Sequence, residues 1–245
     1  MKNTGGKKMS NLESKNIVSK NELENTVSAQ GQTKKIGSVR FWEREGKMKV
    51  LVVGNSITWH SVLPSIGWYG EWGMAASAAD KAFLQRLMVM LEKEYGTLDF
   101  CMAQLAEWEM AYPNGTPLLE EKFASARDFC ADVIVIRIGE NFPKGLVYDA
   151  DVKAYFSNMI KFLRSNENAK VVVTDSFWKN AGRDTMLREI AEENGYTFCQ
   201  INDIEDDPNT MALNDFEHRG VRVHPSDLGM ERIADRIFAS LKTIL

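Results

Sequence analysis

A serine follows a short apolar run near residue 50, in a context that suits a nucleophile. Residues 49–53 read Lys-Val-Leu-Val-Val, and Gly54, Asn55 and Ser56 come directly after them. A buried strand that ends in this way delivers the serine hydroxyl to the carboxyl edge of a sheet, where open α/β folds bind their ligands. We expect a helix to begin after Ser56, so that backbone N–H groups can stabilise a developing oxyanion. The alternative is a serine that only caps this helix.

A histidine close to the C-terminus is the best candidate to accept the proton of that hydroxyl. The chain has three histidines, His60, His218 and His224. An imidazole has an ordinary pKa of about 6.5, so it can take the serine proton and later return it to a leaving alcohol. His224 and Pro225 stand on the loop before the last helical pattern. A surface histidine near the start of that helix is the alternative.

A third polar run, Gly139-Glu140-Asn141, follows the apolar residues 133–138. The side-chain amide of Asn141 would then lie at the same sheet edge as Ser56, where it can donate a hydrogen bond to an oxyanion. The alternative is a turn in which Asn141 bonds only its own backbone.

The runs Gly54-Asn55-Ser56, Gly139-Glu140-Asn141 and His224-Pro225 together resemble the SGNH, or GDSL-like, hydrolase superfamily of esterases and acetylesterases. The resemblance covers most of residues 48–245. It implies a flavodoxin-like fold and an acyl-enzyme on the serine.

The resemblance also implies an oxyanion hole made of the Ser56 N–H, the Asn141 amide and a second backbone N–H. That second donor is usually a glycine in an Asn-x-Gly pattern. Here the corresponding residues are Gln104, Leu105 and Ala106, so the Ala106 N–H is the expected substitute.

The acid that the family places three residues before the histidine is missing, because that position is Val221. An orienting carboxylate holds the imidazole tautomer and stabilises its cation. Three substitutes are open: Asp227, Glu217 or a backbone carbonyl near Val221. Asp227 has a second interpretation, as an acid that favours a helix N-terminus.

Aromatic residues alternate with glycines in residues 66–73, between the serine and the first full helical pattern. Such a loop either presents flat faces to a sugar ring or acyl group, or packs as a lid without a ligand. The expected substrate-binding residues are Trp59, His60, Trp68, Tyr69, Trp72, Trp108 and Glu140.

Short apolar runs alternate with helical patterns from Met48 onward, which is typical of a parallel sheet covered on both faces. The candidate strands are residues 48–53, 98–103, 132–138, 170–175 and 196–200, with helical patterns around residues 83–91, 152–163, 186–190 and 233–241. The sequence therefore predicts an α/β fold, a three-layer α/β/α sandwich with a five-stranded parallel sheet.

We expect one catalytic domain at residues 47–245, preceded by a polar extension at residues 1–46. The apolar patch of that extension is Val39-Arg40-Phe41-Trp42. It is expected either to belong to a solvated tail or to pack as an arm against the domain or a neighbouring subunit of a homo-oligomer.

Composition excludes several classes of function. The net charge is −4, and residues 48–245 carry 20 Lys/Arg against 29 Asp/Glu, so nucleic acid is not an expected partner. Scattered histidines and Cys101, Cys130 and Cys199 lack metal-ligand spacing, and no dinucleotide or Walker motif is present, so no metal and no cofactor are expected. No signal peptide and no run of about 18 apolar residues is visible, which predicts a cytoplasmic protein without a membrane partner, unless an export signal precedes the sequence.

The function that these residues predict is hydrolysis of a small acyl ester, with acetyl esters of carbohydrate as the expected substrate. Ser56 would attack and His224 would act first as base and then as acid. Two alternatives remain at this stage: an acyltransferase, in which an alcohol other than water accepts the acyl group, and a catalytically silent binding module.

Overall fold

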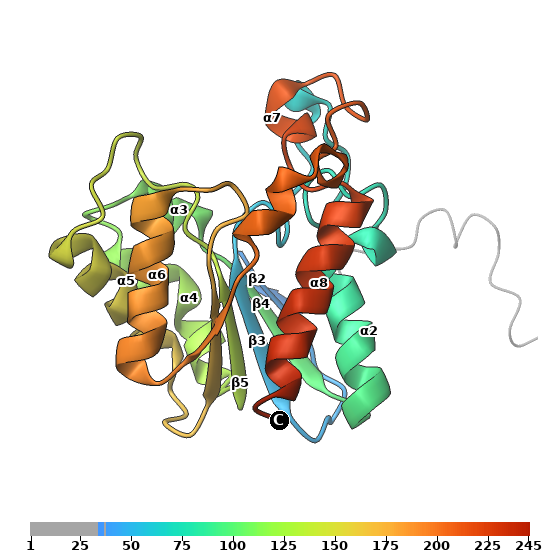
Figure 1. The fold of residues 1–245 in the computed structure, drawn as a ribbon. Helices are drawn as coiled ribbons and strands as arrows, with labels where there is room; N and C mark the ends of the chain where they lie inside the picture. Colours follow the sequence, from blue (N-terminus) through green and yellow to red (C-terminus); the bar gives the residue numbers. More distant parts are fainter. Residues whose placement is uncertain (1–33, 37) are drawn as a thin grey trace, which may run out of the picture. The chain divides into compact units, whose positions relative to one another are not determined.

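The computed structural model describes residues 34–36 and 38–245, and within them a seven-stranded sheet forms the centre of the fold (Figure 1). The strand order is β1-β2-β4-β3-β5-β6-β7. The strands are β1 (Lys34–Ile36), β2 (Val39–Trp42), β3 (Lys49–Gly54), β4 (Asp99–Gln104), β5 (Val133–Arg137), β6 (Lys170–Thr174) and β7 (Thr197–Cys199). Strands β3 to β7 pair in parallel, which confirms the predicted five-stranded parallel sheet.

Strand β3 shows why the strands read as unbroken apolar runs. Val50 and Val52 pack into one core cluster, whereas Leu51 and Val53 pack into the other. Successive side chains of a strand point to opposite faces of the sheet, so a strand covered on both faces must be apolar at every position.

Helices cover both faces of the sheet and complete the predicted three layers (Figure 1). Helices α2 (Phe83–Tyr95) and α8 (Asp227–Lys242) lie on one face and pack against each other. The other face carries α4 (Thr116–Asp128), α5 (Ala150–Leu163) and α6 (Ala181–Asn194). The sequence patterns miss α4, because its buried residues are few and end in the small Ala126. No helix among residues 34–36 and 38–245 combines the length and the apolar character needed to cross a membrane.

The antiparallel strands β1 and β2 correct the predicted domain boundary. Strand β2 pairs with β4, and the folded unit begins at Lys34 rather than at residue 47. Val39 and Phe41 are buried, while Arg40 lies over the ring of Trp59 at 3.8 Å. A four-residue strand is too short for its alternation to stand out in a polar region, so the sequence pattern alone does not separate this segment from the extension. The remainder of the extension, residues 1–33, lies outside the described residues.

Two irregular segments stand at the carboxyl ends of the parallel strands, where the candidate site residues lie. Residues 55–82 connect β3 to α2, and the short helix α7 (Arg219–Arg222) lies in the segment before α8. The two segments share a small apolar cluster, formed by Trp68, Met74, Ala75, Ala212 and Val221. This cluster fixes the loop after Ser56 against the loop before His224.

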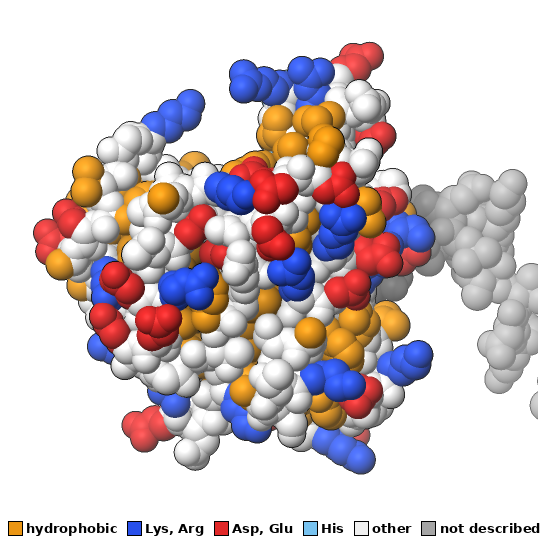
Figure 2. Space-filling model, in the orientation of Figure 1, with side chains coloured by type: hydrophobic (Ala, Val, Ile, Leu, Met, Phe, Trp, Pro, Cys, Tyr) orange, Lys and Arg blue, Asp and Glu red, His pale blue; other side chains and the backbone are white. Residues whose placement is uncertain are grey.

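Positive and negative side chains are mixed on the face shown in Figure 2, rather than gathered into a patch of one sign. A nucleic-acid surface would require clustered Lys and Arg side chains. The expectation that nucleic acid is not a partner stays a prediction from the net charge.

Candidate active site

Ser56 lies in a tight turn that follows β3. The N–H groups of Thr58 and Trp59 donate to the Asn55 carbonyl, at 2.9 and 3.0 Å. The turn is close enough that a Cβ added at Gly54 would lie 1.7 Å from the Thr58 hydroxyl, so glycine is required there. The predicted helix after Ser56 is wrong, since Pro64 and the glycines of residues 67–73 follow within a few residues and do not sustain a helix.

The turn still provides a donor. Ser56 accepts a hydrogen bond from Met74 through its carbonyl, at 2.9 Å, while its N–H donates to no other residue in the described part of the chain. The backbone N–H beside the hydroxyl is thus available to an oxyanion.

Ser56 and His224 lie together at this edge. The Ser56 Oγ is 2.9 Å from Nε2 of His224, within hydrogen-bond distance. His224 is 7% exposed, and its ring contacts the ring of Trp178 at 5.1 Å and 89°. A serine hydroxyl that donates to Nε2 leaves the ring hydrogen on Nδ1.

Burial lowers the pKa of His224 to about 4. A backbone contact with Gly220 and the charge of Glu140 oppose this shift, whereas His60 and Arg137 add to it. The imidazole is therefore neutral at pH 7 and able to accept a proton from Ser56.

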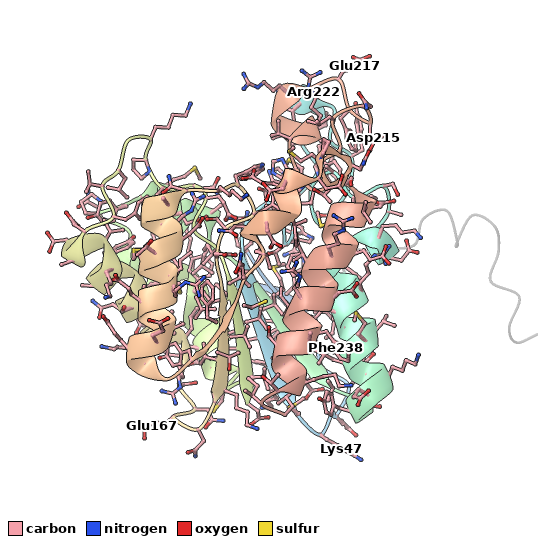
Figure 3. All side chains as sticks on the ribbon, in the orientation of Figure 1. Lys47, Glu167, Asp215, Glu217, Arg222 and Phe238 are labelled. Atoms are coloured by element: carbon pink, nitrogen blue, oxygen red, sulfur yellow. The ribbon has the colours of Figure 1, made fainter. Side chains whose placement is uncertain are left out.

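Among the residues that the structure describes, no carboxylate is bonded to His224 in place of the missing acid. Val221 is fully buried in the small apolar cluster. Asp227 accepts hydrogen bonds from Ser77 N and Ser77 Oγ, at 2.8 and 2.6 Å. Glu217 is exposed at the outer tip of the segment that carries α7 (Figure 3). Neither acid bonds His224, so both predicted substitutes are wrong. Nδ1 of His224 has no partner with hydrogen-bond geometry among the described residues, although the backbone of Gly220 is close enough to raise the pKa of the imidazole. The third predicted substitute, a backbone carbonyl near Val221, therefore stays a prediction.

Asn141 is held by a carboxylate that the sequence analysis did not identify. Glu109 Oε2 accepts from the Asn141 side-chain amide at 2.8 Å, and Oε1 accepts from the backbone N–H groups of Gly139 and Asn141, at 2.7 and 3.1 Å. One hydrogen of the Asn141 amide is used in this way, and the second can be donated to an oxyanion. Burial and the nearby Glu140 raise the pKa of Glu109 to about 7.

Glu140 belongs to the support of the site rather than to a substrate surface, which corrects its predicted role. Its side chain is 1% exposed and forms an ion pair with Arg137. Asn55 Nδ2 donates to Glu140 Oε2 at 2.7 Å, and Arg137 Nη1 donates to Asn55 Oδ1 at 2.9 Å. Burial alone would raise the pKa of Glu140, but Arg137 and Arg183 lower it. The turn of Ser56 and the loop of Asn141 are therefore tied together by buried charges.

Ala106 begins the short helix α3 (Ala106–Met110), directly after β4. The register pairs Gly54 with Gln104, so Ser56 and Ala106 each stand two residues beyond a matched position on neighbouring strands. The Ala106 N–H donates to Gln104 Oε1 at 3.3 Å, a long contact that a better acceptor can replace. The role of Ala106 as the second oxyanion donor stays a prediction.

Three of the predicted aromatic contacts are in the core instead. Trp59 is buried beside Arg40, Trp68 is 2% exposed between Trp72 and Phe216, and Trp108 is fully buried and stacks on Tyr155 at 4.5 Å. The prediction that these three side chains bind substrate is wrong. Alternation with glycine, in the case of Trp68, and nearness in sequence to Ser56 or Ala106, in the case of Trp59 and Trp108, do not reveal which rings are buried.

The other predicted contacts keep some exposure. Tyr69 is 71% exposed, and His60 is partly exposed and close enough to affect the pKa of His224. Trp72 is partly buried, and its indole N–H donates to the Ala76 carbonyl at 2.8 Å. Among the described residues, no group of three or more His, Cys, Asp and Glu side chains is arranged to hold a metal ion.

Solved structures share this fold, although no protein-family model and no curated protein matches the chain. A family two carbohydrate esterase from Clostridium thermocellum, in complex with cellohexaose, is similar with a TM-score of 0.58 at 16% identity, over 82% of this chain and 65% of its own. A putative GDSL-like lipase from Bacteroides uniformis gives 0.52 at 17% identity, over 82% and 98% of the two chains.

A catalytic mutant of an acetylxylan esterase from Geobacillus stearothermophilus gives a TM-score of 0.50 at 17% identity, over 80% of this chain and 94% of that one. The chain spans slightly less than two thirds of the carbohydrate esterase and nearly all of the other two. These similarities confirm the predicted three-layer α/β/α fold.

Proposed function

We propose that the protein is a serine esterase that hydrolyses small acyl esters, with acetyl groups on carbohydrate as its substrate class. The observation that carries the proposal is the 2.9 Å contact between Ser56 Oγ and Nε2 of His224. The fold does not need a buried, neutral imidazole beside a serine hydroxyl for its stability. This is, however, the arrangement that activates a serine as a nucleophile.

In the first half of the reaction, His224 Nε2 takes the proton of Ser56 as Oγ bonds to the ester carbonyl carbon. The carbonyl oxygen becomes an oxyanion, which accepts hydrogen bonds from the N–H groups of Ser56 and Ala106 and from the Asn141 amide. When the oxyanion collapses, the bond from carbon to the alcohol oxygen breaks. His224 returns its proton to that oxygen, and the alcohol leaves.

In the second half, a water molecule attacks the acyl group on Ser56 and gives a proton to His224. The acyl carbon then releases Ser56 Oγ, which recovers the proton from His224, and the carboxylic acid departs. The cation on His224 is transient in both halves. The Gly220 backbone and the charge of Glu140 both favour it, so they supply part of what an orienting carboxylate would give.

The substrate class rests on the structural neighbours and on access to the serine. The solved structures with this fold include a carbohydrate esterase and an acetylxylan esterase. Beside the serine, His60 is partly exposed and close enough to affect the pKa of His224, which gives a polar and aromatic side chain suited to contact a sugar.

The test is hydrolysis of p-nitrophenyl acetate and acetylated xylo-oligosaccharides by the full chain and by Ser56→Ala. Ser56→Ala should lose turnover and labelling by a fluorophosphonate, while its thermal unfolding is unchanged. Ser77→Ala, at an exposed serine bonded to Asp227, is the control and should keep both. Turnover that survives in Ser56→Ala would contradict the proposal, and acetyl transfer to an added sugar would replace hydrolysis by acyl transfer.

A further inference from the structure

Trp178 packs against the ring of His224, whose Nδ1 has no hydrogen-bond partner among the described residues. Its indole Nε1–H donates to the carbonyl of Val223, the residue before His224, at 3.0 Å. Its ring also meets the imidazole nearly perpendicularly, with centroids 5.1 Å apart. One side chain therefore fixes both the backbone that leads into His224 and the position of its ring.

Trp178 is itself firmly held. Arg183 Nη2 donates to the Trp178 carbonyl at 2.5 Å, Nη1 donates to the Gly139 carbonyl at 3.2 Å, and Nε donates to Ser176 Oγ at 2.7 Å. One residue earlier, the Phe177 N–H donates to Glu140 Oε1 at 3.0 Å. The same buried charges that hold the loop of Asn141 thus also hold the loop of Trp178, and they connect both loops to His224.

We propose that Trp178 is a positioning residue, which keeps the imidazole of His224 oriented and shielded from water in place of the carboxylate absent at position 221. The inference rests on the proposed function of the Ser56 and His224 pair. A tryptophan cannot stabilise the imidazolium as an anion would, so its contribution is orientation rather than charge.

Two properties of the contact make this role specific. The hydrogen bond uses the indole N–H, which phenylalanine lacks, whereas the ring contact needs only an aromatic side chain. Replacing Trp178 by Phe therefore removes the first alone, and replacing it by Leu removes both. The charged and titratable groups that face His224 are His60, Arg137 and Glu140, and neither substitution alters them.

The kinetic test measures kcat and KM for p-nitrophenyl acetate in Trp178→Phe and Trp178→Leu. We expect kcat to fall about 2- to 10-fold in Trp178→Phe and about 5- to 100-fold in Trp178→Leu, with KM changed less than about twofold. The control is Trp42→Phe, a partly buried tryptophan at the end of strand β2, which should keep wild-type kcat. Wild-type kcat in both Trp178 variants would overturn the proposal.

A second measurement is independent of turnover. The imidazole NMR signals of the three histidines are followed with pH, and His224 is identified by the loss of its signals in His224→Gln. In the wild type His224 should stay neutral down to about pH 4, whereas in Trp178→Leu water reaches the ring and its pKa should rise towards the ordinary value of about 6.5. An unchanged His224 pKa in a folded Trp178→Leu would overturn the proposal. If the wild type has no esterase activity but this shift appears, the proposed function and the catalytic role of Trp178 both fail, and only the shielding of His224 by Trp178 stands.

Discussion

Ser56 Oγ and Nε2 of His224 lie 2.9 Å apart, although 168 positions separate the two residues in the chain. Two backbone hydrogen bonds fix the segment that carries His224. The His224 carbonyl accepts from the Ala212 N–H at 3.0 Å, and the Ser226 N–H donates to the Thr210 carbonyl at 2.8 Å. The pair can therefore exchange a proton without movement of either chain segment.

The first prediction concerns the pH dependence of activity. Because burial lowers the pKa of His224 to about 4, the base should remain neutral over most of the acidic range. The value of kcat/KM for p-nitrophenyl acetate should stay level from pH 8 to about 5 and fall only near pH 4. A fall of kcat/KM with a midpoint near pH 6.5 would contradict this prediction, because it would show that the imidazole is exposed to water.

The same pKa shift predicts how stability changes with pH. The unfolded chain carries a histidine with an ordinary pKa, so between pH 6.5 and 4 it binds a proton that folded His224 does not. The contribution of His224 to the free energy of unfolding is thus complete above pH 6.5 and is lost as the pH falls towards 4. Urea unfolding of the wild type and of His224→Gln, at pH 7.5 and pH 4.5, isolates this contribution.

A second prediction concerns Glu109→Gln. In the wild type all four contacts of the carboxylate are with donors, namely the N–H groups of Gly139 and Asn141 and the side-chain amides of Asn141 and Asn55. Glutamine would place an NH₂ group against two of these amides. We expect a loss of about 1 to 3 kcal/mol in stability and about tenfold in kcat, since Asn141 loses its support.

The control for this variant lies on the same helix. Glu107 is exposed and pairs with Lys122, so Glu107→Gln should change stability by less than about 0.5 kcal/mol and leave kcat unchanged. Equal effects of the two variants, in urea unfolding and in p-nitrophenyl acetate turnover, would remove Glu109 from the support of the site.

The sequence was sufficient for the parts of the molecule that depend on local pattern. Unbroken apolar runs identified strands β3 to β7, and the short polar runs after two of them placed Ser56 and Asn141 at one edge. Strand β2 was missed because it is short and includes the buried Arg40, whose burial depends on a distant partner, Trp59.

The supporting residues of the site could not be predicted, because no local spacing marks them. Glu109 and Trp178 act through contacts with Asn141, Val223 and His224, which lie tens of residues away in the chain. The prediction that buried tryptophans bind substrate was wrong for the same reason. A tryptophan pattern is identical whether the ring is exposed or is buried as Trp108 is.

The third prediction addresses the two acids that the sequence suggested as partners of His224. Asp227→Asn and Glu217→Gln should keep kcat within about twofold of wild type, because neither side chain bonds the imidazole. Asp227→Asn should instead lower stability by about 0.5 to 1 kcal/mol, since it weakens the bonds to Ser77 and removes a charge from the first turn of α8. A large loss of kcat in either variant, with normal stability, would restore that acid to the catalytic group.

The last prediction concerns Asp175, a buried carboxyl at the end of β6. Its Oδ1 accepts from the N–H groups of Ile201 and Asn202, at 2.6 and 3.0 Å, whereas Oδ2 has no partner in the described part of the chain. Burial and repulsion from Asp184 raise its pKa to about 6. The folded state therefore holds the proton more tightly than the unfolded state, and the ionised carboxyl destabilises the protein above about pH 6.

Asp175→Asn keeps the Oδ1 acceptor and removes the buried charge. We subtract the free energy of unfolding of the wild type from that of Asp175→Asn at each pH. This difference should be about 1 to 2 kcal/mol larger at pH 8 than at pH 3.5. The range allows for the weakening of the buried charge's effect by solvent and by Arg188. Asp203→Asn should show the opposite sign, because Arg236 lowers the pKa of Asp203 and its charge is stabilising. Urea unfolding at the two pH values measures both differences, and a difference of the same sign in the two variants would contradict the assignment of Asp175 as a destabilising buried charge.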